Sequence, residues 1–263
     1  MFEEKTMVDT TMNSAQGFPV LQPRKIGFLS PFVWLKKGWQ DLVHSLRASL
    51  GHGLIITAMG WVVLMFTSSH LYMFTAAISG FLLVSPLMAA GVYELSRRRE
   101  SGQPVTFEDS LHGLQRNGGR LTRFAGVMVL FIVAWFVISD LILNEYFGRD
   151  IPALSGAIYQ TSWFSGGPKF LLTYSAVGGV VALLVFMLSV VAVPMMIDRG
   201  VAPGVAMLTS MRTVWLNIPG MLHWAMLLTL LTLVGFATQL WGMIVIIPWL
   251  GHSTWHAYRD TIG

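Results

Sequence analysis

The chain has 263 residues, of which 54% are hydrophobic and only 11% are charged, against roughly 25% charged residues in a typical soluble domain. A soluble fold of this length needs more charged side chains to cover its surface, whereas hydrocarbon as the solvent removes that need. The absence of cysteine excludes disulfides, thiolate catalysis, iron–sulfur clusters and cysteine-ligated zinc. The composition therefore indicates an integral membrane protein.

The chain begins with a polar tail, residues 1–30, that has no apolar stretch of signal-peptide length. We therefore expect no cleavable signal peptide. We expect the rest of the chain, 31–263, to form a single membrane-spanning domain.

The segment that follows the tail, residues 34–50, has apolar side chains at helical spacing. Polar and charged residues lie between them, namely Lys36, Lys37, Asp41 and Arg47. This pattern predicts an amphipathic helix in the headgroup plane, with its basic side chains against anionic lipid. The alternative is a polar connector that begins the first span early.

Uncharged runs long enough to cross a bilayer predict six transmembrane helices. They cover residues 52–70, 72–94, 124–143, 170–197, 220–239 and 241–257. We interpret successive pairs as helical hairpins, the last of which has almost no loop between its two spans. The predicted fold is therefore an all-α membrane protein with six spans.

The distribution of basic residues predicts the orientation of these spans. Fifteen of the seventeen Lys and Arg residues lie before the first span, in the links between hairpins or after the last span, and only Arg149 and Lys169 lie on the other side. The positive-inside rule then places both termini in the cytoplasm. The basic charge of the chain is thus a topology signal, and we expect no nucleic-acid partner.

An internal repeat accompanies the three hairpins. A Ser-apolar-basic triplet precedes each hairpin and a proline lies late in each second span; the triplets begin at Ser45, Ser110 and Ser210, and the prolines are Pro86, Pro194 and Pro248. The matching positions predict three same-direction units, about 34–99, 106–199 and 203–260, each with a cytoplasmic amphipathic helix and two spans. Same-direction units imply a pseudo-threefold axis along the membrane normal.

Few residues within the predicted spans are candidates for proton transfer or for binding a metal, a cation or haem. Asp140 is the one acid well inside an apolar run; it is either a proton or cation site or a residue that reaches water or pairs with Arg149 or Lys169. His252 and His256 are four residues apart and share a helix face, so they form a metal or haem site only if His52 or His223 approaches them. Interfacial histidines without a ligand are the alternative.

The segment 144–169 is the largest predicted piece on the outer side, and its Tyr159 and Trp163 are candidate interface anchors or partner contacts. An ordered loop that covers its own bundle is the alternative. The sequence has no P-loop, dinucleotide fingerprint, His-Glu-x-x-His motif or nucleophile elbow. We therefore expect no enzyme, no cofactor and no metal, and we expect bound lipids.

Three strings of the sequence resemble a family of predicted bacterial integral membrane proteins of unknown function, the domain of unknown function 2189. They are GFLLVSPLMAAGVYELSRRRESGQP, VPMMIDRGVAPGVAMLTSM and PWLGHSTWHAYRD. The resemblance extends over most of the chain from Pro31 onward and implies a bacterial inner membrane, six spans and no agreed activity. Some family members carry a cytochrome c oxidase label, which implies association with an oxidase, because the chain lacks the spans and ligand histidines of a catalytic subunit.

Our preferred functional hypothesis is a non-catalytic accessory or structural subunit of a larger bacterial inner-membrane complex, such as a respiratory terminal oxidase or supercomplex. Scarce intramembrane charge and the lack of assignable cofactor ligands favour it. The first alternative is a transporter or channel for a small solute, which predicts a cavity lined by Ser, Thr and Asn at the pseudo-threefold axis. The second is a haem- or metal-handling protein, which requires the four histidines to converge.

Overall fold

The computed structural model describes residues 22–67, 71–148 and 167–263. The regular structure in these ranges is entirely helical, which confirms the predicted all-α class. The helices are α1 (Ser30–His44), α2 (Leu46–Thr67), α3 (Leu71–Met88), α4 (Ala90–Glu100), α5 (Phe107–Phe147), α6 (Gly167–Ser189), α7 (Ala192–Arg199), α8 (Pro203–Leu216), α9 (Ile218–Ala237) and α10 (Met243–Ile262).

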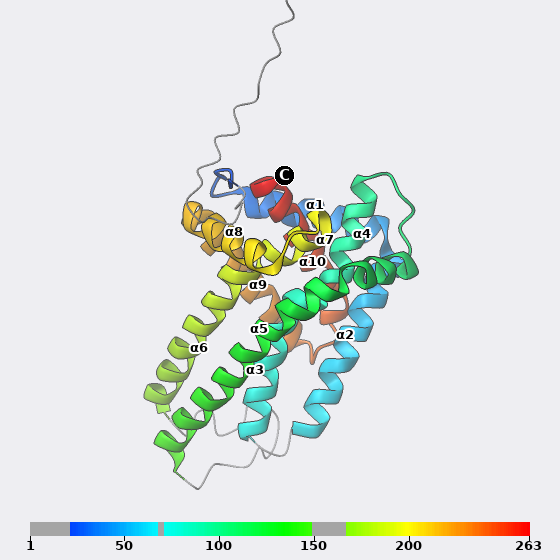
Figure 1. The fold of residues 1–263 in the computed structure, drawn as a ribbon. Coiled ribbons are helices and arrows are strands. Elements are labelled where there is room, and N and C mark those ends of the chain that lie inside the picture. Colours follow the sequence, from blue (N-terminus) through cyan, green and yellow to red (C-terminus); the bar gives the residue numbers. More distant parts are fainter. Residues whose placement is uncertain (1–21, 68–70, 149–166) are drawn as a thin grey trace, which may run out of the picture.

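The longer helices lie side by side in a bundle, and a layer of shorter helices covers one end of it (Figure 1). Helices α2, α3, α6 and α9 belong to the bundle, whereas α1, α4, α7 and α8 belong to the layer. Helix α5 begins in the layer and continues through the bundle for 41 residues in all. The described start of the chain and its C-terminus both lie at the layer end (Figure 1).

Four helical stretches are long and apolar enough to cross a membrane: Leu46–Phe66, Phe107–Phe147, Gly167–Arg199 and Ile218–Ala237. They correspond to the first, third, fourth and fifth predicted spans. The second predicted span, 72–94, falls on α3 and α4, and the sixth, 241–257, falls on α10. These helices are not among the four.

Helix α3 has 18 residues and no charged side chain, but several of its side chains lie outside the described part of the structure. Only Ala89 separates α3 from α4, and the Ala89 N–H donates to the Ser85 carbonyl at 3.0 Å. Helix α10 continues through Pro248, but its second half is polar, with His252, His256, Arg259 and Asp260. That half packs in the layer and does not extend along the bundle.

Helix α1 corrects the prediction for residues 34–50. The predicted single helix is interrupted at Ser45, between the end of α1 and the start of α2. The apolar side chains of Trp34 and Leu42 are 1% and 2% exposed, and α1 packs mainly on α10. The indole nitrogen of Trp34 donates to Asp260 Oδ2 at 3.0 Å. The predicted apolar face of α1 therefore contacts protein.

A second apolar stripe of α1 remains exposed. Phe32, Trp39 and Val43 are 45–54% exposed, and Lys36 and Lys37 beside them are exposed as well. Apolar side chains flanked by cations are typical of a helix that lies in the headgroup region. We therefore still expect α1 to lie in the headgroup region, but with this second stripe, and not the face of Trp34 and Leu42, against lipid.

Candidate functional site: an ionic layer and an apolar cavity

Asp41 on α1 is 4% exposed and joins three helices of the layer. Ser96 Oγ on α4 donates to Asp41 Oδ2 at 2.6 Å, and His256 Nε2 on α10 lies 3.0 Å from the same oxygen. Arg99 on α4 forms an ion pair with Asp41 Oδ1. Burial raises the pKa of Asp41, but the hydrogen bonds from His256 and Ser96 and the nearby histidine charges outweigh it and hold that pKa below its usual value.

The hydrogen bonds continue from Ser96 into the interior. Ser96 Oγ lies 2.7 Å from His252 Nδ1, and His252 Nε2 lies 2.8 Å from Ser49 Oγ on α2. Because Ser96 gives its hydroxyl proton to Asp41, His252 Nδ1 is the donor and Nε2 accepts from Ser49. Ser49 and His252 are both fully buried. The Ser–His pair therefore links α2, α4 and α10 and offers no accessible nucleophile.

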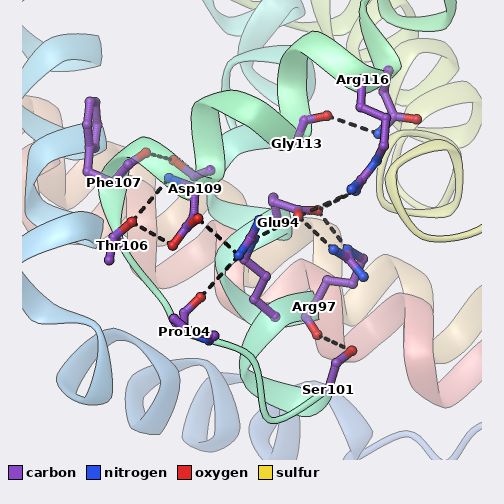
Figure 2. Close-up of polar contacts among 12 residues, drawn as sticks. Glu94, Arg97, Ser101, Pro104, Thr106, Phe107, Asp109, Gly113 and Arg116 are labelled. Atoms are coloured by element: carbon purple, nitrogen blue, oxygen red, sulfur yellow. Dashed lines mark hydrogen bonds and ion pairs between the residues drawn. The ribbon is translucent and has the colours of Figure 1, made fainter.

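A second centre of the layer is Glu94 on α4, which is fully buried. Figure 2 shows its carboxylate between arginines of α4 and α5. Arg97 Nε and Nη2 each donate to it at 2.7 Å, Arg98 Nε at 3.1 Å and Arg116 Nη2 at 3.4 Å. Hydrogen bonding to Glu94 raises the pKa of Arg97. One buried carboxylate thus binds three guanidinium groups.

The close approach of α4 and α5 at Glu94 requires a glycine. A Cβ atom at Gly113 would overlap with Cγ and Cδ of Glu94, so any larger residue must displace the carboxylate. Helix α5 begins nearby at Thr106, whose hydroxyl accepts from the Asp109 N–H at 3.1 Å. Asp109 also pairs with Arg98 at 3.2 Å (Figure 2). This local geometry fixes the position of Gly113 against Glu94.

A third centre connects α7 with the end of α10. Tyr258 Oη donates to Asp198 Oδ2 at 2.6 Å and accepts from Arg199 Nε at 2.9 Å. Burial and donation to Asp198 both raise the pKa of Tyr258. Arg259 bridges Asp198 at 3.5 Å and Glu100 at 3.0 Å. We call these three centres together the ionic layer: the Asp41, Glu94 and Asp198 clusters.

The structure separates the candidate histidines. His256 contacts Asp41 directly, and His252 is linked to it through Ser96. His52 Nε2 instead lies 2.7 Å from Ser110 Oγ, and His223 Nδ1 lies 2.8 Å from the Phe28 carbonyl oxygen. Within residues 22–67, 71–148 and 167–263, no group of three or more metal-ligating side chains could hold an ion. The geometry therefore assigns these histidines structural hydrogen bonds.

The remaining candidate site residues are Asp140, Tyr159 and Trp163. Asp140 is partly buried on α5 and has no ion pair with Lys169 or any other cation in the described part of the chain. Tyr159 and Trp163 lie outside the described residues. Asp140 therefore does not pair with Lys169, and the roles of Tyr159 and Trp163 stay predictions.

The serines of the three repeat triplets lie in comparable surroundings. Each of Ser45, Ser110 and Ser210 is at most 7% exposed. Ser45 Oγ donates to the Asp41 carbonyl at 2.9 Å, Ser110 Oγ donates to the Phe107 carbonyl at 2.5 Å, and Ser210 Oγ accepts from the backbone N–H of Val191 at 3.2 Å. A buried, hydrogen-bonded serine thus recurs at the start of each unit.

Sequence reasoning missed the acids on which the layer depends. The amphipathic pattern of residues 34–50 places Asp41 on the polar face of a helix, and no pattern described above gives Glu94 a role. A signal was present, because Glu94 precedes Arg97 and Arg98 by three and four residues, which is the spacing of helical ion pairs. Nothing in the sequence indicated that Asp41 meets His252 and His256, more than 200 residues away.

A cavity of about 720 Å³ lies between α2, α3, α6, α9 and α10. Its lining is mainly apolar, with hydroxyl groups from Thr57, Ser85, Ser189, Thr229 and Thr254. No charged side chain is among the described residues that line it. A cavity of this size is in the range of small-molecule sites.

The apolar helices, the layer at one end and the internal cavity define a multi-pass integral membrane protein. Residues 73–198 match the model of a family described as "Predicted integral membrane protein (DUF2189)", and this segment is similar to that family. No curated protein and no solved structure matches the chain. The matched segment extends from α3 to α7, so it contains Glu94 but neither Asp41 nor the histidines of α10.

Proposed function

We propose that the chain crosses a bacterial inner membrane six times, as three same-direction hairpin units with both termini in the cytoplasm. The shared location of the described start and the C-terminus supports this topology (Figure 1). The recurring buried serines support the three units.

Single cysteines test the topology, because the chain has none of its own. Ser101→Cys follows α4 in the layer, and Trp241→Cys lies between α9 and α10. An impermeant maleimide applied to intact spheroplasts is expected to label only the variant at position 241. Labelling of both positions, or of position 101 alone, would contradict the proposed topology.

We further propose that the protein is a non-catalytic structural subunit of a larger inner-membrane complex, with a respiratory oxidase as the first candidate partner. One observation supports this most directly: the buried carboxylates of Asp41 and Glu94 are both paired with arginine or histidine of the same chain. Their charges therefore serve internal packing and are not presented to a substrate.

Gentle extraction from the native membrane, followed by native gel electrophoresis and mass spectrometry, tests this role. Co-migration with other subunits in fixed stoichiometry is the expected result. If a partner is found, Tyr159→Ala and Trp163→Ala are expected to release it. Trp241→Ala is the matched control, since Trp241 is 63% exposed in the described part of the chain. Migration of the protein alone, or only with itself, would overturn the proposal.

A transporter or channel for a small uncharged solute is the second candidate function. The cavity supports it, because hydroxyl groups from several helices line it and Pro86 bounds it. Uptake of neutral solutes into proteoliposomes tests this role. Transport that is blocked by Gly179→Leu, which adds a side chain at the cavity wall, would favour the transporter over the structural subunit.

A further inference from the structure

The two ends of the cavity differ in chemistry. Thr57, Tyr93 and Thr254 provide hydroxyl groups where the cavity approaches the ionic layer, whereas residues such as Leu64 and Phe236 line it further along the bundle. Thr57 follows His52 by five residues on α2, which is about 7 Å along the helix. An occupant would therefore meet these three hydroxyl groups at one end and mainly hydrocarbon along the rest of its length, where Thr229 and Thr232 on α9 add further hydroxyl groups.

One of these hydroxyl groups is free to bind. Tyr93 is hydrogen-bonded to Thr254, which itself donates to the Leu250 carbonyl. Thr57 is 5% exposed, and its Oγ1 has no hydrogen-bond partner among the described residues. A buried hydroxyl without a partner costs about 1–3 kcal/mol. Oγ1 is shielded in the present rotamer, and a rotation about the Cα–Cβ bond would turn it toward the cavity that Thr57 lines.

The cavity reaches the surface of the bundle between α6 and α9. Leu183 on α6 and Met226 and Leu233 on α9 line it and are 39%, 52% and 56% exposed. Helices α6 and α9 are not among the closely packed helix pairs. Since both are apolar spans, the opening faces the hydrocarbon of the bilayer, and a lipophilic molecule enters there without crossing water.

The cavity has a volume of about 720 Å³, which lies within the roughly 300–1,000 Å³ of small-molecule sites. One long acyl or isoprenoid chain with a small head is a lipophilic molecule of that size class.

We infer that this cavity binds one neutral lipophilic molecule, whose carbonyl or similar acceptor receives the Thr57 hydroxyl while its chain lies between α6 and α9. The absence of charge on the described lining excludes a charged head inside the cavity. The inference goes beyond both candidate functions, because it assigns a ligand to a site and does not depend on partners or on transport.

Photolabelling of the full-length protein in nanodiscs tests the inference. The probe is the methyl ester of a diazirine-bearing hexadecanoic acid, which is neutral and has one carbonyl acceptor. Labelling is expected to be saturable, to map to α2, α6 and α9, and to be displaced by methyl hexadecanoate. Equal displacement by phosphatidylglycerol would overturn a neutral ligand in favour of a phospholipid.

Two pairs of variants locate the site. Gly179 lines the cavity and Gly126 does not, and a Cβ at either meets no atom within 4 Å. Gly179→Leu is expected to abolish saturable labelling, and Gly126→Leu to leave it unchanged. Thr57→Val is expected to weaken probe binding by about three- to tenfold through the lost hydrogen bond. Thr229→Val should have no effect, because the Thr229 hydroxyl already donates to the Ala225 carbonyl.

Size-exclusion chromatography of each variant separates misfolding from loss of the site. A monodisperse Gly179→Leu protein that still labels like the wild type would overturn the inference. So would labelling that does not saturate, or that maps to lipid-facing residues throughout the bundle.

Discussion

Replacing Glu94 with glutamine is the most direct test of the ionic layer. The substitution keeps the size of the side chain but removes the one carboxylate that three guanidinium groups share. Removing one partner of a buried ion pair costs about 3–5 kcal/mol, because the remaining charge stays buried. Arg97, Arg98 and Arg116 keep 17%, 16% and 55% of their side chains exposed. Water relieves part of the repulsion, so we expect about 3 kcal/mol.

For a chain of this size, that loss corresponds to a fall in Tm of about 6–12 °C. Thermal unfolding in mild detergent, followed by tryptophan fluorescence, measures it. Glu108→Gln is the matched control, because Glu108 lies exposed near the start of α5 and has no ion pair within the described residues. A Glu94→Gln protein with the Tm of the Glu108→Gln control would refute the role of Glu94 as the carboxylate that holds the three arginines.

Three further outcomes are expected from the layer. Because the folded state lowers the pKa of Asp41, its stabilisation is present at neutral pH and is lost as the pH falls through that pKa. The stability gap between wild type and Asp41→Asn should therefore narrow from about pH 7 to about pH 3 in denaturant titrations; a constant gap would contradict this. Gly113→Ala should lower stability by about 1–3 kcal/mol through overlap with Glu94, whereas Gly119→Ala, whose Cβ meets nothing within 4 Å, should raise it by up to about 1 kcal/mol. Equal effects of the two glycine substitutions would be inconsistent with the overlap. Tyr258→Phe should cost about 1–3 kcal/mol because Asp198 loses a short hydrogen bond, and an unchanged Tm would argue against that bond.

The positions of the apolar helices could be predicted from the sequence because hydropathy is a local property. Runs of apolar residues located α2, α6, α9 and the membrane part of α5. The two halves of α10 were harder to assign. Its apolar first half resembles a span. Its polar second half is stabilised by hydrogen bonds and ion pairs with residues on α1, α4 and α7, which no local sequence pattern reveals.

The ionic layer could be predicted only in part. The short-range pairs of Glu94 with Arg97 and Arg98 follow from helical spacing, but the pairing of Asp41 with α10 is a tertiary property. The histidines illustrate the same limit. Their spacing in α10 permitted a metal site, and the structure instead uses His252 and His256 to bind Asp41 and two serines. The hydroxyl-lined cavity likewise depends on how five helices pack.

The packing of α1 on α10 has a consequence for biosynthesis. Asp41 leaves the ribosome 58 residues before Arg99 and 215 residues before His256. At about 5–20 residues per second, the histidine follows the carboxylate by roughly 10–40 s. During that interval Trp34 and Asp41 are without the surface that finally encloses them. Helix α1 therefore reaches its native environment only when α10 is complete, and a nascent chain that ends before α10 lacks the partners of Trp34 and Asp41 on that helix.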